Sequence, residues 1–288
     1  MWPARQAASR LELGRAFPGR RGYGYTGRTW VQRRELRYDS SEFRAASDLA
    51  RRLPNYPRVS ALAAIVVRDP AVIPVIAAIW RLPVLDLRVR RADADAWPGA
   101  VGLIDGIERD KRWAQAVLDL PTVEEHYLAG RRKQALRTNL RHARDLGVTS
   151  DRIPTYEAWS EAASVILHAR GDGPAAAWEM RKPTSGQQVA YYVARDAYET
   201  PLVFARVALF GQFAVLLAML SHLDRHPSAS WARYQLHTFL ALDLGCSGVK
   251  HLLVGSALRA PAGNQYFQHL LGYRPRHLRV EVVEPSAT

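Results

Sequence analysis

The residues best suited to chemistry stand in the stretch SHLDRH, residues 221–226. It offers His222, Asp224 and His226 at alternate positions, so in a continuing strand all three side chains fall on one face. Histidine titrates near neutral pH and can take a proton from an incoming amine, directly or through one water. Two other interpretations stay open, namely surface residues at a strand end and metal ligands. Nothing nearby completes a metal site, so the sequence predicts none.

A basic helix is the second feature. The stretch GRRKQALRTNLRHARDLGV, residues 130–148, carries six Arg and Lys side chains and one acid. At roughly 100° per residue, Lys133, Arg137, Arg141 and Arg144 fall in one narrow arc, opposite a wider apolar arc. This pattern predicts an outward basic stripe. A solvated face usually mixes charge signs, so an anion-binding surface is the alternative interpretation.

Two polar residues of this helix, Arg132 and Asn139, fall inside its apolar arc. A buried guanidinium or amide group needs hydrogen-bond partners. We therefore expect both side chains either to face a cleft, where they contact a ligand, or to make structural hydrogen bonds.

The surrounding chain alternates helix and strand patterns. Thr122 and Glu125 have the spacing of a capping box, and Gly147 is typical after a helix end, so we expect one helix between Thr122 and Gly147. Helices, an antiparallel meander and then helix–strand–helix–strand predict a mixed α/β sheet. The expected strands are residues 61–67, 84–90, 187–196, 201–210, 213–223, 249–255 and 278–283, and the other expected helices are residues 70–82, 156–170, 230–244 and 263–271.

Composition restricts the class of protein. The chain has 288 residues, is 48% hydrophobic and 23% charged, and carries a formal net charge of +13. It can build a packed core, and its charge favours anionic partners such as nucleic acid, phosphorylated cofactors or an acidic membrane surface. The single cysteine, Cys246, excludes an intrachain disulfide. Charges and prolines interrupt the most apolar stretch, Ala61–Trp80, so we expect no membrane span and a cytoplasmic, soluble protein.

The basic helix and the C-terminal stretches ARYQLHTFLALDLGCSGVKHLLVGS and NQYFQHLLGYRPRHLRV together resemble the GNAT superfamily, in the branch of FemAB-like, Fem-type aminoacyl transferases. The resemblance covers about residues 121–283. It implies a mixed, mostly antiparallel central sheet flanked by helices. It also implies transfer of an acyl group from acyl-CoA or aminoacyl-tRNA to an amine, with no tightly bound cofactor.

The resemblance places the donor-binding loop at RHPSAS. Arg225, Ser228 and Ser230 keep the spacing of the family motif R/Q-x-x-G-x-G/A, but serines replace both glycines. Backbone N–H groups at the start of the next helix still attract an anion, and Arg233 is a further donor-binding candidate. Side chains at the glycine positions hinder close approach of a pyrophosphate. Fem-type members likewise lack this loop and use aminoacyl-tRNA, which favours tRNA over CoA as the donor.

The family's catalytic tyrosine stands four residues before the glycine of a closing Gly-aromatic pair. Here that pair is Gly272-Tyr273, and the matching residue is Gln268, which cannot act as an acid. Tyr266 is the nearby tyrosine that can replace it. The expected catalytic residues are therefore Tyr266 with His222 and Asp224.

Three segments are expected. Residues 1–60 form a basic, partly flexible N-terminal segment, either a mobile arm or one that touches nucleic acid. Residues 61–120 form a degenerate second GNAT-like half, and residues 121–288 form the acyltransferase domain. The leading hypothesis is an N-acyltransferase or aminoacyltransferase with an amine acceptor, whose basic stripe holds donor phosphates of tRNA or CoA. The alternative is a non-catalytic nucleic-acid-binding or partner-binding protein on the same scaffold.

Overall fold

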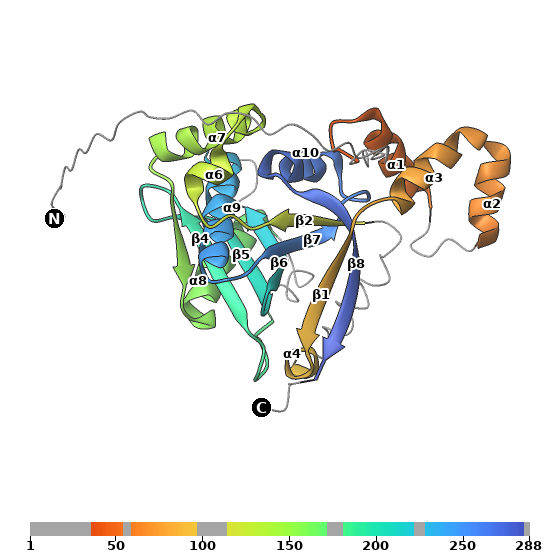
Figure 1. Cartoon of the computed structure of the whole chain (residues 1–288). Helices are drawn as coiled ribbons and strands as arrows, with labels where there is room; N and C mark the ends of the chain where they lie inside the picture. The colour runs from red at the N-terminus through yellow and green to blue at the C-terminus, as the bar shows by residue number, and fades with distance from the viewer. Residues whose placement is uncertain (1–35, 54–58, 97–113, 172–180, 222–227, 285–288) are drawn as a thin grey trace, which may run out of the picture. The chain divides into compact units, whose positions relative to one another are not determined.

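A computed structural model describes residues 36–53, 59–96, 114–171, 181–221 and 228–284, all within one compact unit of the chain. Its strands form one eight-stranded sheet in the order β1-β8-β2-β7-β6-β5-β4-β3 (Figure 1). The strands are β1 Val84–Arg90, β2 Gln115–Asp119, β3 Thr149–Ile153, β4 Val189–Arg195, β5 Pro201–Phe210, β6 Phe213–Ser221, β7 His251–Ser256 and β8 Arg274–Val283.

The sheet is mixed and mostly antiparallel. Only β1 with β8 and β6 with β7 run parallel among the described strands, and the other neighbouring pairs are antiparallel. The predicted fold class, a mixed, mostly antiparallel sheet flanked by helices, is confirmed. The helical elements are α1 Ser41–Arg52, α2 Val59–Arg68, η1 Pro70–Val72, α3 Ile73–Trp80, α4 Arg91–Ala96, α6 Glu124–Leu128, η3 Arg131–Lys133, α7 Gln134–Asp145, α8 Tyr156–Arg170, α9 Ala229–Cys246 and α10 Ala262–Leu271.

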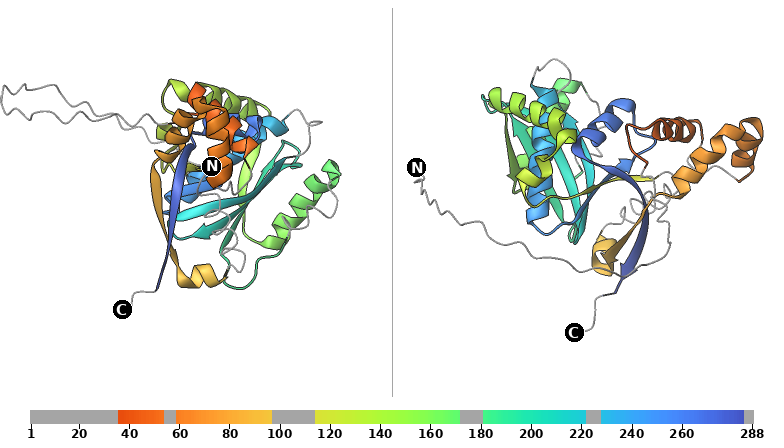
Figure 2. Two further views of the ribbon diagram at one scale, coloured as in Figure 1. Left: turned by 90° about the vertical axis from the view of Figure 1, so that its right-hand side faces the viewer. Right: turned by 45° about the horizontal axis from the view of Figure 1, so that its top comes forward.

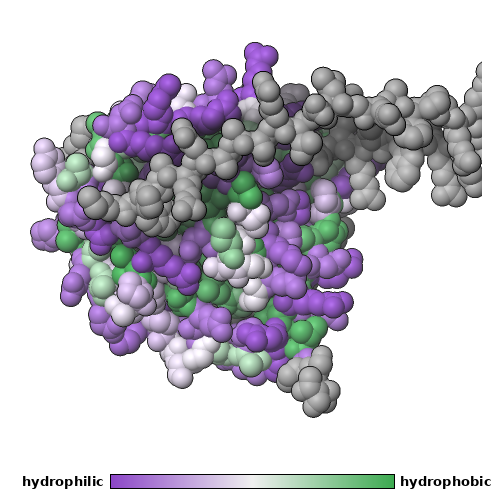
Figure 3. All heavy atoms as spheres, turned by 60° about the vertical axis from the view of Figure 1, so that its left-hand side comes forward, coloured by the Kyte–Doolittle hydropathy of each residue, from purple (hydrophilic) through white to green (hydrophobic). Residues whose placement is uncertain are grey.

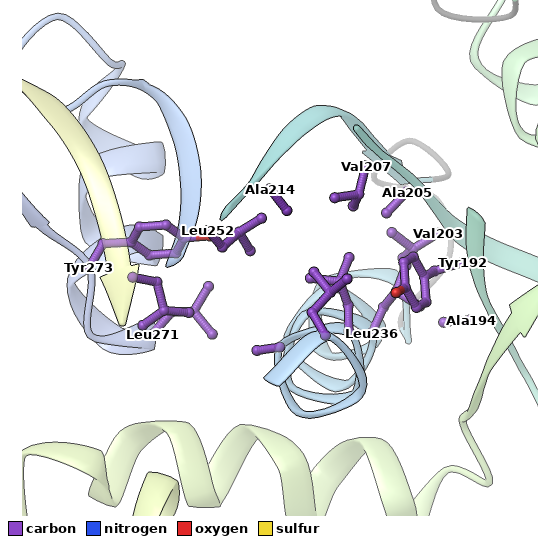
Figure 4. Packing of buried hydrophobic residues seen from close by; sticks show 14 of the residues in the cluster. Tyr192, Ala194, Val203, Ala205, Val207, Ala214, Leu236, Leu252, Leu271 and Tyr273 are labelled. Atoms are coloured by element: carbon purple, nitrogen blue, oxygen red, sulfur yellow. The ribbon is translucent and has the colours of Figure 1, made fainter. Parts of the chain in front are cut away.

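Alternating side chains of β5 build a core on each face of the sheet. Val203 and Val207 join the cluster that contains Leu236 of α9, whereas Phe204 packs against Trp159 of α8. Figure 4 shows the strand residues of the first cluster lying against Leu236. Since successive residues of a strand point to opposite faces, one strand supports both helices. The central meander is therefore buried on both sides.

The parallel pair β6 and β7 is held together at its start only. Phe213, Ala214 and Val215 pair with the first three residues of β7, and beyond them β6 pairs with β5 and β7 with β2. The two strands diverge, and α9 follows the diverging end of β6 in the chain. The sheet is therefore splayed where these two strands part.

Two expected elements are wrong. The stretch 61–67, expected as a strand, lies in the helix α2. A short apolar run does not distinguish strand from helix by periodicity, and its three alanines favour helix. The single helix expected between Thr122 and Gly147 is broken into α6, η3 and α7, because Gly130 adopts a φ of 86° between them.

The remaining elements mostly agree with expectation. The strands expected at 84–90, 187–196, 201–210, 213–223, 249–255 and 278–283 correspond to β1, β4, β5, β6, β7 and β8, whereas β2, β3, α1 and α4 were not predicted from the sequence. Residues 61–120 contribute both β1 and β2 to the sheet. The division into three segments stays a prediction, and the first 35 residues lie outside the described part.

A substitution at Gly245 tests how closely α9, the longest described helix, packs against the chain beside it. Gly245 lies in the last turn of α9, where a Cβ would collide with the carbonyl oxygen of Pro121. We predict that Gly245→Ala lowers the free energy of unfolding by about 1–3 kcal/mol, because backbone on both sides must move. Chemical denaturation measures the change. Gly263→Ala in α10 is the control, since nothing lies within 4 Å of its Cβ. Equal stability of the two variants would contradict the close approach.

Candidate functional site

The start of α9 stands where β6 and β7 diverge. Ser228 precedes the helix and is buried, but its side chain makes no capping hydrogen bond, whereas Ser230 in the first turn is exposed. The N–H groups of a helix's first turn lack intrahelical partners and carry positive partial charge. This helix end therefore presents donors to an anion.

A cation and three aromatic rings meet at the junction of α9 and α10. The Arg233 guanidinium carbon lies 4.9 Å from the Phe267 ring centre, and Tyr234 packs on the same ring at 5.0 Å. Tyr266 is 59% exposed and lies near enough to Tyr234 to contribute to its raised pKa, which burial mainly causes. We call Arg233, Tyr234, Tyr266 and Phe267 the α9–α10 cluster.

Arg233 is held in an unusual state for an arginine. Its Nε is buried and has no hydrogen-bond partner among the described residues, and burial lowers its pKa. The side chain as a whole is half-buried, and a partly desolvated guanidinium without a carboxylate partner is stabilised by an anion. Arg233 is thus well placed for the donor-binding role expected from the sequence.

His237 and Tyr273 form a buried hydrogen-bonded pair beside this cluster. The His237 Nε2 and the Tyr273 hydroxyl are 2.7 Å apart, and the imidazole packs edge-on against Phe267. Burial, assisted by Lys133 and Arg233, lowers the pKa of His237 to about 3, so the ring is neutral at physiological pH. Its Nδ1 has no hydrogen-bond partner within the described chain. His237 therefore contacts both Phe267 of the α9–α10 cluster and Tyr273.

Tyr273 also lines a cavity of about 830 Å³. The cavity lies among the segment before α1, the end of β2, α6, η3 and the turn from α10 into β8. Figure 4 shows Tyr273 beside Leu271, another of its lining residues. Its acidic, basic and histidine lining residues are Arg37, Asp39, Asp119, His126, Arg132, Lys133, His269, Arg274 and Arg276, and the rest is largely apolar apart from Tyr38, Thr122, Tyr127 and Tyr273. A cavity of this size accommodates a small organic molecule, and the surplus of cations favours an anion.

Lys133 closes one side of the cavity. Its Nζ donates to the carbonyl oxygens of Leu271 at 2.7 Å and Leu270 at 3.3 Å, at the negative end of α10. It also lies 4.2 Å from the Tyr127 ring centre, and the Tyr127 hydroxyl donates to the same Leu271 oxygen at 2.8 Å. Burial lowers the pKa of Lys133 to about 8. This ammonium is the most readily deprotonated lysine among the described residues.

Gln268, at the position of the family's catalytic tyrosine, is buried. Its Oε1 accepts a hydrogen bond of 2.9 Å from the Tyr38 hydroxyl, whose pKa is raised by burial. An amide in this setting accepts and donates hydrogen bonds but releases no proton. Acid catalysis at this position is therefore excluded, as the sequence indicated.

The expected outward stripe of four basic residues is wrong for Lys133 alone, since Arg137, Arg141 and Arg144 are exposed. Lys133 turns inward, because it ends the separate turn η3 instead of continuing the α-helix. Arg137 donates to the carbonyl oxygens of Leu128 and Gly130, and Arg144 pairs with Glu124 at 2.7 Å. Arg141 alone of the four is exposed with no side-chain partner in the described part of the chain.

Hydrophilic side chains gather along the top of the face shown in Figure 3, where Figure 1 places α7. Of the two residues expected to face a cleft, Arg132 lines the cavity and Asn139, which is half-buried, does not.

Four sequence candidates, His222, Asp224, Arg225 and His226, lie outside the described residues. Within the described part of the chain, no group of three His, Cys, Asp or Glu side chains is arranged to hold a metal ion. Sequence reasoning missed His237, Tyr38 and Tyr127. A signal existed for His237, which is a lone histidine on the apolar side of the helix ARYQLHTFLALDL.

No family model matches the sequence, and no curated protein matches it. Among solved structures, the chain is similar to FemX, with 11% identity and a TM-score of 0.45 over 57% of this chain and 59% of that one. It is similar to L-PGS from Bacillus licheniformis, with 12% identity and a TM-score of 0.40 over 56% and 57%.

A third similar structure is the C-terminal domain of a protein assigned as a lysylphosphatidylglycerol synthetase from Agrobacterium fabrum. It has 15% identity and a TM-score of 0.39 over 57% of this chain and 58% of that one. In each of these comparisons the match spans less than three fifths of the other chain.

The lowered pKa of Lys133 predicts a pH dependence of stability. Between pH 8 and its ordinary value of 10.5, the unfolded chain binds more protons at Lys133 than the folded chain does. The contribution of Lys133 to the free energy of unfolding therefore rises with pH across this window. Urea denaturation at several pH values should show the rise in the wild type and not in Lys133→Met.

Lys182→Met is the matched control. In the wild type, the hydrogen bond of Lys182 to Glu157 raises the pKa of Lys182. The stability from Lys182 is fully present below pH 10.5 and is lost only above it. A constant difference between the wild type and Lys133→Met from pH 8 to 10.5 would show that Lys133 is not desolvated.

Proposed function

We propose that this chain is a GNAT-like N-acyltransferase or aminoacyltransferase, which moves an acyl group from an activated donor to an amine. The observation that supports the proposal best is the divergence of β6 and β7 after three paired residues, followed by the start of α9. In such an arrangement strand backbone groups beyond Val215 and Leu253 have no partner across the divergence. They are available to align and polarise a donor carbonyl.

The proposed donor site is the start of α9 together with the α9–α10 cluster. Donor phosphates contact the N–H groups after Ser228 and the guanidinium of Arg233, whose Nε has no partner among the described residues. The exposed Ser230 hydroxyl and Arg225 of the preceding loop complete the proposed set. A β-bulge opposite Arg206 and Val207 bends β6 next to this position.

The proposed acceptor site is the cavity. His237 contacts Phe267 of the α9–α10 cluster and bonds to Tyr273 of the cavity lining, so the two sites adjoin. In the reaction the amine nitrogen attacks the donor carbonyl carbon. A C–N bond forms, and the C–S bond of a thioester or the C–O bond of a tRNA ester breaks. One proton leaves the nitrogen and one is added to the departing sulfur or oxygen.

The proton donor that we propose is Tyr266, because its hydroxyl lies on the α9–α10 side while Gln268 is buried against Tyr38. For proton removal we propose His222 and Asp224, on the sequence argument alone. The neutral ring of His237, with a pKa of about 3, orients Tyr273 rather than acting as a base.

Aminoacyl-tRNA is the favoured donor and acyl-CoA the second. Serines 228 and 230 replace the glycines that let a pyrophosphate approach the backbone closely. Arg141 is exposed and has no described partner, which suits a contact to a tRNA phosphate. One observation favours a different class of function: the catalytic tyrosine position holds a buried glutamine. That feature supports a nucleic-acid-binding or partner-binding protein on the same scaffold.

Thermal unfolding with CoA, acetyl-CoA and bulk tRNA tests the donor. A ligand that binds only the folded chain raises the melting temperature by mass action. We predict that tRNA raises it and that Arg233→Met reduces the tRNA affinity at least tenfold. The log–log slope of affinity against salt should also become shallower by roughly 0.7–0.9 for each phosphate that the variant no longer neutralises. Arg141→Glu should reduce affinity for all tRNA sequences alike.

Arg279→Met is the control, since Arg279 is an exposed residue of β8 paired with Asp86. A shift with CoA that needs Arg233, and none with tRNA, would identify acyl-CoA as the donor. No shift with any of the three ligands would overturn the transferase proposal in favour of the partner-binding alternative. Unchanged tRNA affinity in Arg233→Met would overturn the proposed donor site.

A further inference from the structure

The helical segment made of α2, η1 and α3, residues 59–80, is almost entirely apolar. It reads VSALAAIVVR, Asp69, PAV and IPVIAAIW, so its only charged residues are Arg68 and Asp69. Figures 1 and 2 show α2 extending beyond α3, away from the sheet. We call this segment the apolar projection.

Large apolar side chains of the projection are exposed. Val67 is 80% exposed, Ile73 51% and Trp80 70%. Among the described elements, α3 packs on α1 and η1, and Ile79 is buried there, whereas the main contacts of α2 are with η1. One side of α3 is thus covered by the protein, whereas Val67 near the end of α2 is largely exposed.

This exposure is energetically unfavourable in water. Each 100 Å² of apolar surface left in water forgoes about 2.5 kcal/mol of burial free energy. A helix that is apolar all round is normally buried, and a contiguous exposed apolar patch marks a protein or membrane contact. The projection therefore has a partner outside the described chain.

The charges around the projection favour an anionic partner. Arg68 ends α2, Arg81 follows α3, and Arg44 and Arg52 are exposed on α1. The acids on these elements are Glu42, Asp48 and Asp69, and Asp48 is paired with Arg51. With a net charge of +13, a second copy of the chain is repelled, whereas an anionic surface is attracted.

A bilayer surface fits both properties. Trp at the edge of an apolar helix, with Arg beside it, suits the boundary between headgroups and acyl chains. No helix in the described part of the chain is long and apolar enough to cross a membrane, so contact is at the surface. We propose that the projection docks on an anionic lipid bilayer, with Val67, Ile73 and Trp80 in its interface and Arg68 and Arg81 at lipid phosphates.

This docking surface is independent of the transferase proposal. The test is co-sedimentation of the full chain with vesicles of phosphatidylglycerol and phosphatidylcholine, and with vesicles of phosphatidylcholine alone. Binding should require phosphatidylglycerol and weaken with salt. Trp80→Ala should reduce the vesicle affinity at least tenfold. Arg68→Gln with Arg81→Gln should reduce it by about thirtyfold, at roughly 1 kcal/mol for each charge. Tyr198→Ala removes an aromatic side chain that is 88% exposed in the β4–β5 turn, and it should change nothing.

Two results would overturn the proposal. Vesicle binding that depends on salt but is the same in Trp80→Ala would come from general charge and not from the projection. A concentration-dependent dimer that Trp80→Ala converts to monomer, with no vesicle binding, would assign the projection to a second copy. Circular dichroism and unchanged melting temperatures of the variants without ligand establish that they are folded.

Discussion

Three residue pairs between β6 and β7 join the two halves of the sheet. The strand order places β1, β8, β2 and β7 on one side of this junction and β6, β5, β4 and β3 on the other. So short a backbone ladder cannot by itself fix the two halves relative to each other. The apolar cluster does so, because it takes Ala214 and Val207 from one side, Leu252 and Tyr273 from the other, and Leu236 from α9. Among the strands, α9 packs mainly on β3, β4 and β5, and it meets the other half through the shared cluster and the His237–Tyr273 hydrogen bond, which stabilises the divergence at the site.

The same junction explains the unusual electrostatics of the site. Where the halves diverge, polar groups lie deep among apolar ones, so His237 stays neutral and Lys133 holds its proton weakly. Lys133 is retained there because two carbonyl oxygens at the end of α10 and the Tyr127 ring compensate its burial. A residue that replaced Gly272 would meet the Lys133 amine at 2.7 Å, and its φ of 91° suits glycine alone. The turn that forms the family-like Gly-aromatic pair therefore also shapes the cavity.

The sequence predicted elements whose determinants are local. Thr155 caps α8 by accepting a hydrogen bond from the Ala158 N–H, and Gly171 ends the helix at a φ of 69°. Both ends of α8 could therefore be predicted from the local sequence. The meander was predicted from its long apolar runs. The strands β2 and β3 have five residues each, too few for a periodic signal. The assignment of 61–67 as a strand failed because a run that is apolar at every position gives no contrast between its faces.

The candidate site was predicted in part for the same reason. Arg233 and Tyr266 were proposed from stretches that resemble the family, which is a local property, and the structure brings them together in the α9–α10 cluster. The direction of Lys133 depends on carbonyl groups 137 and 138 residues away in the chain, at the end of α10, and on a turn that starts after Gly130. The Tyr38 bond to Gln268 spans 230 residues. Contacts between residues so far apart in the chain depend on the strand order of the sheet. They cannot be predicted from a local motif around either partner.

The positive charge of the chain is distributed in a way that limits its partners. Part of it is neutralised internally, as by the pairs of Arg276 with Asp119 and Arg144 with Glu124. Cations without a printed side-chain partner in the described part of the chain include three at separate places: Arg141 on α7, Arg132 at the cavity, and Arg68 beside the apolar projection. One large anion contacting all three would have to span α7, the cavity and the outer end of α2. Separate anionic partners, each with its own apolar or aromatic surroundings, account for this distribution more simply than a single nucleic-acid surface does.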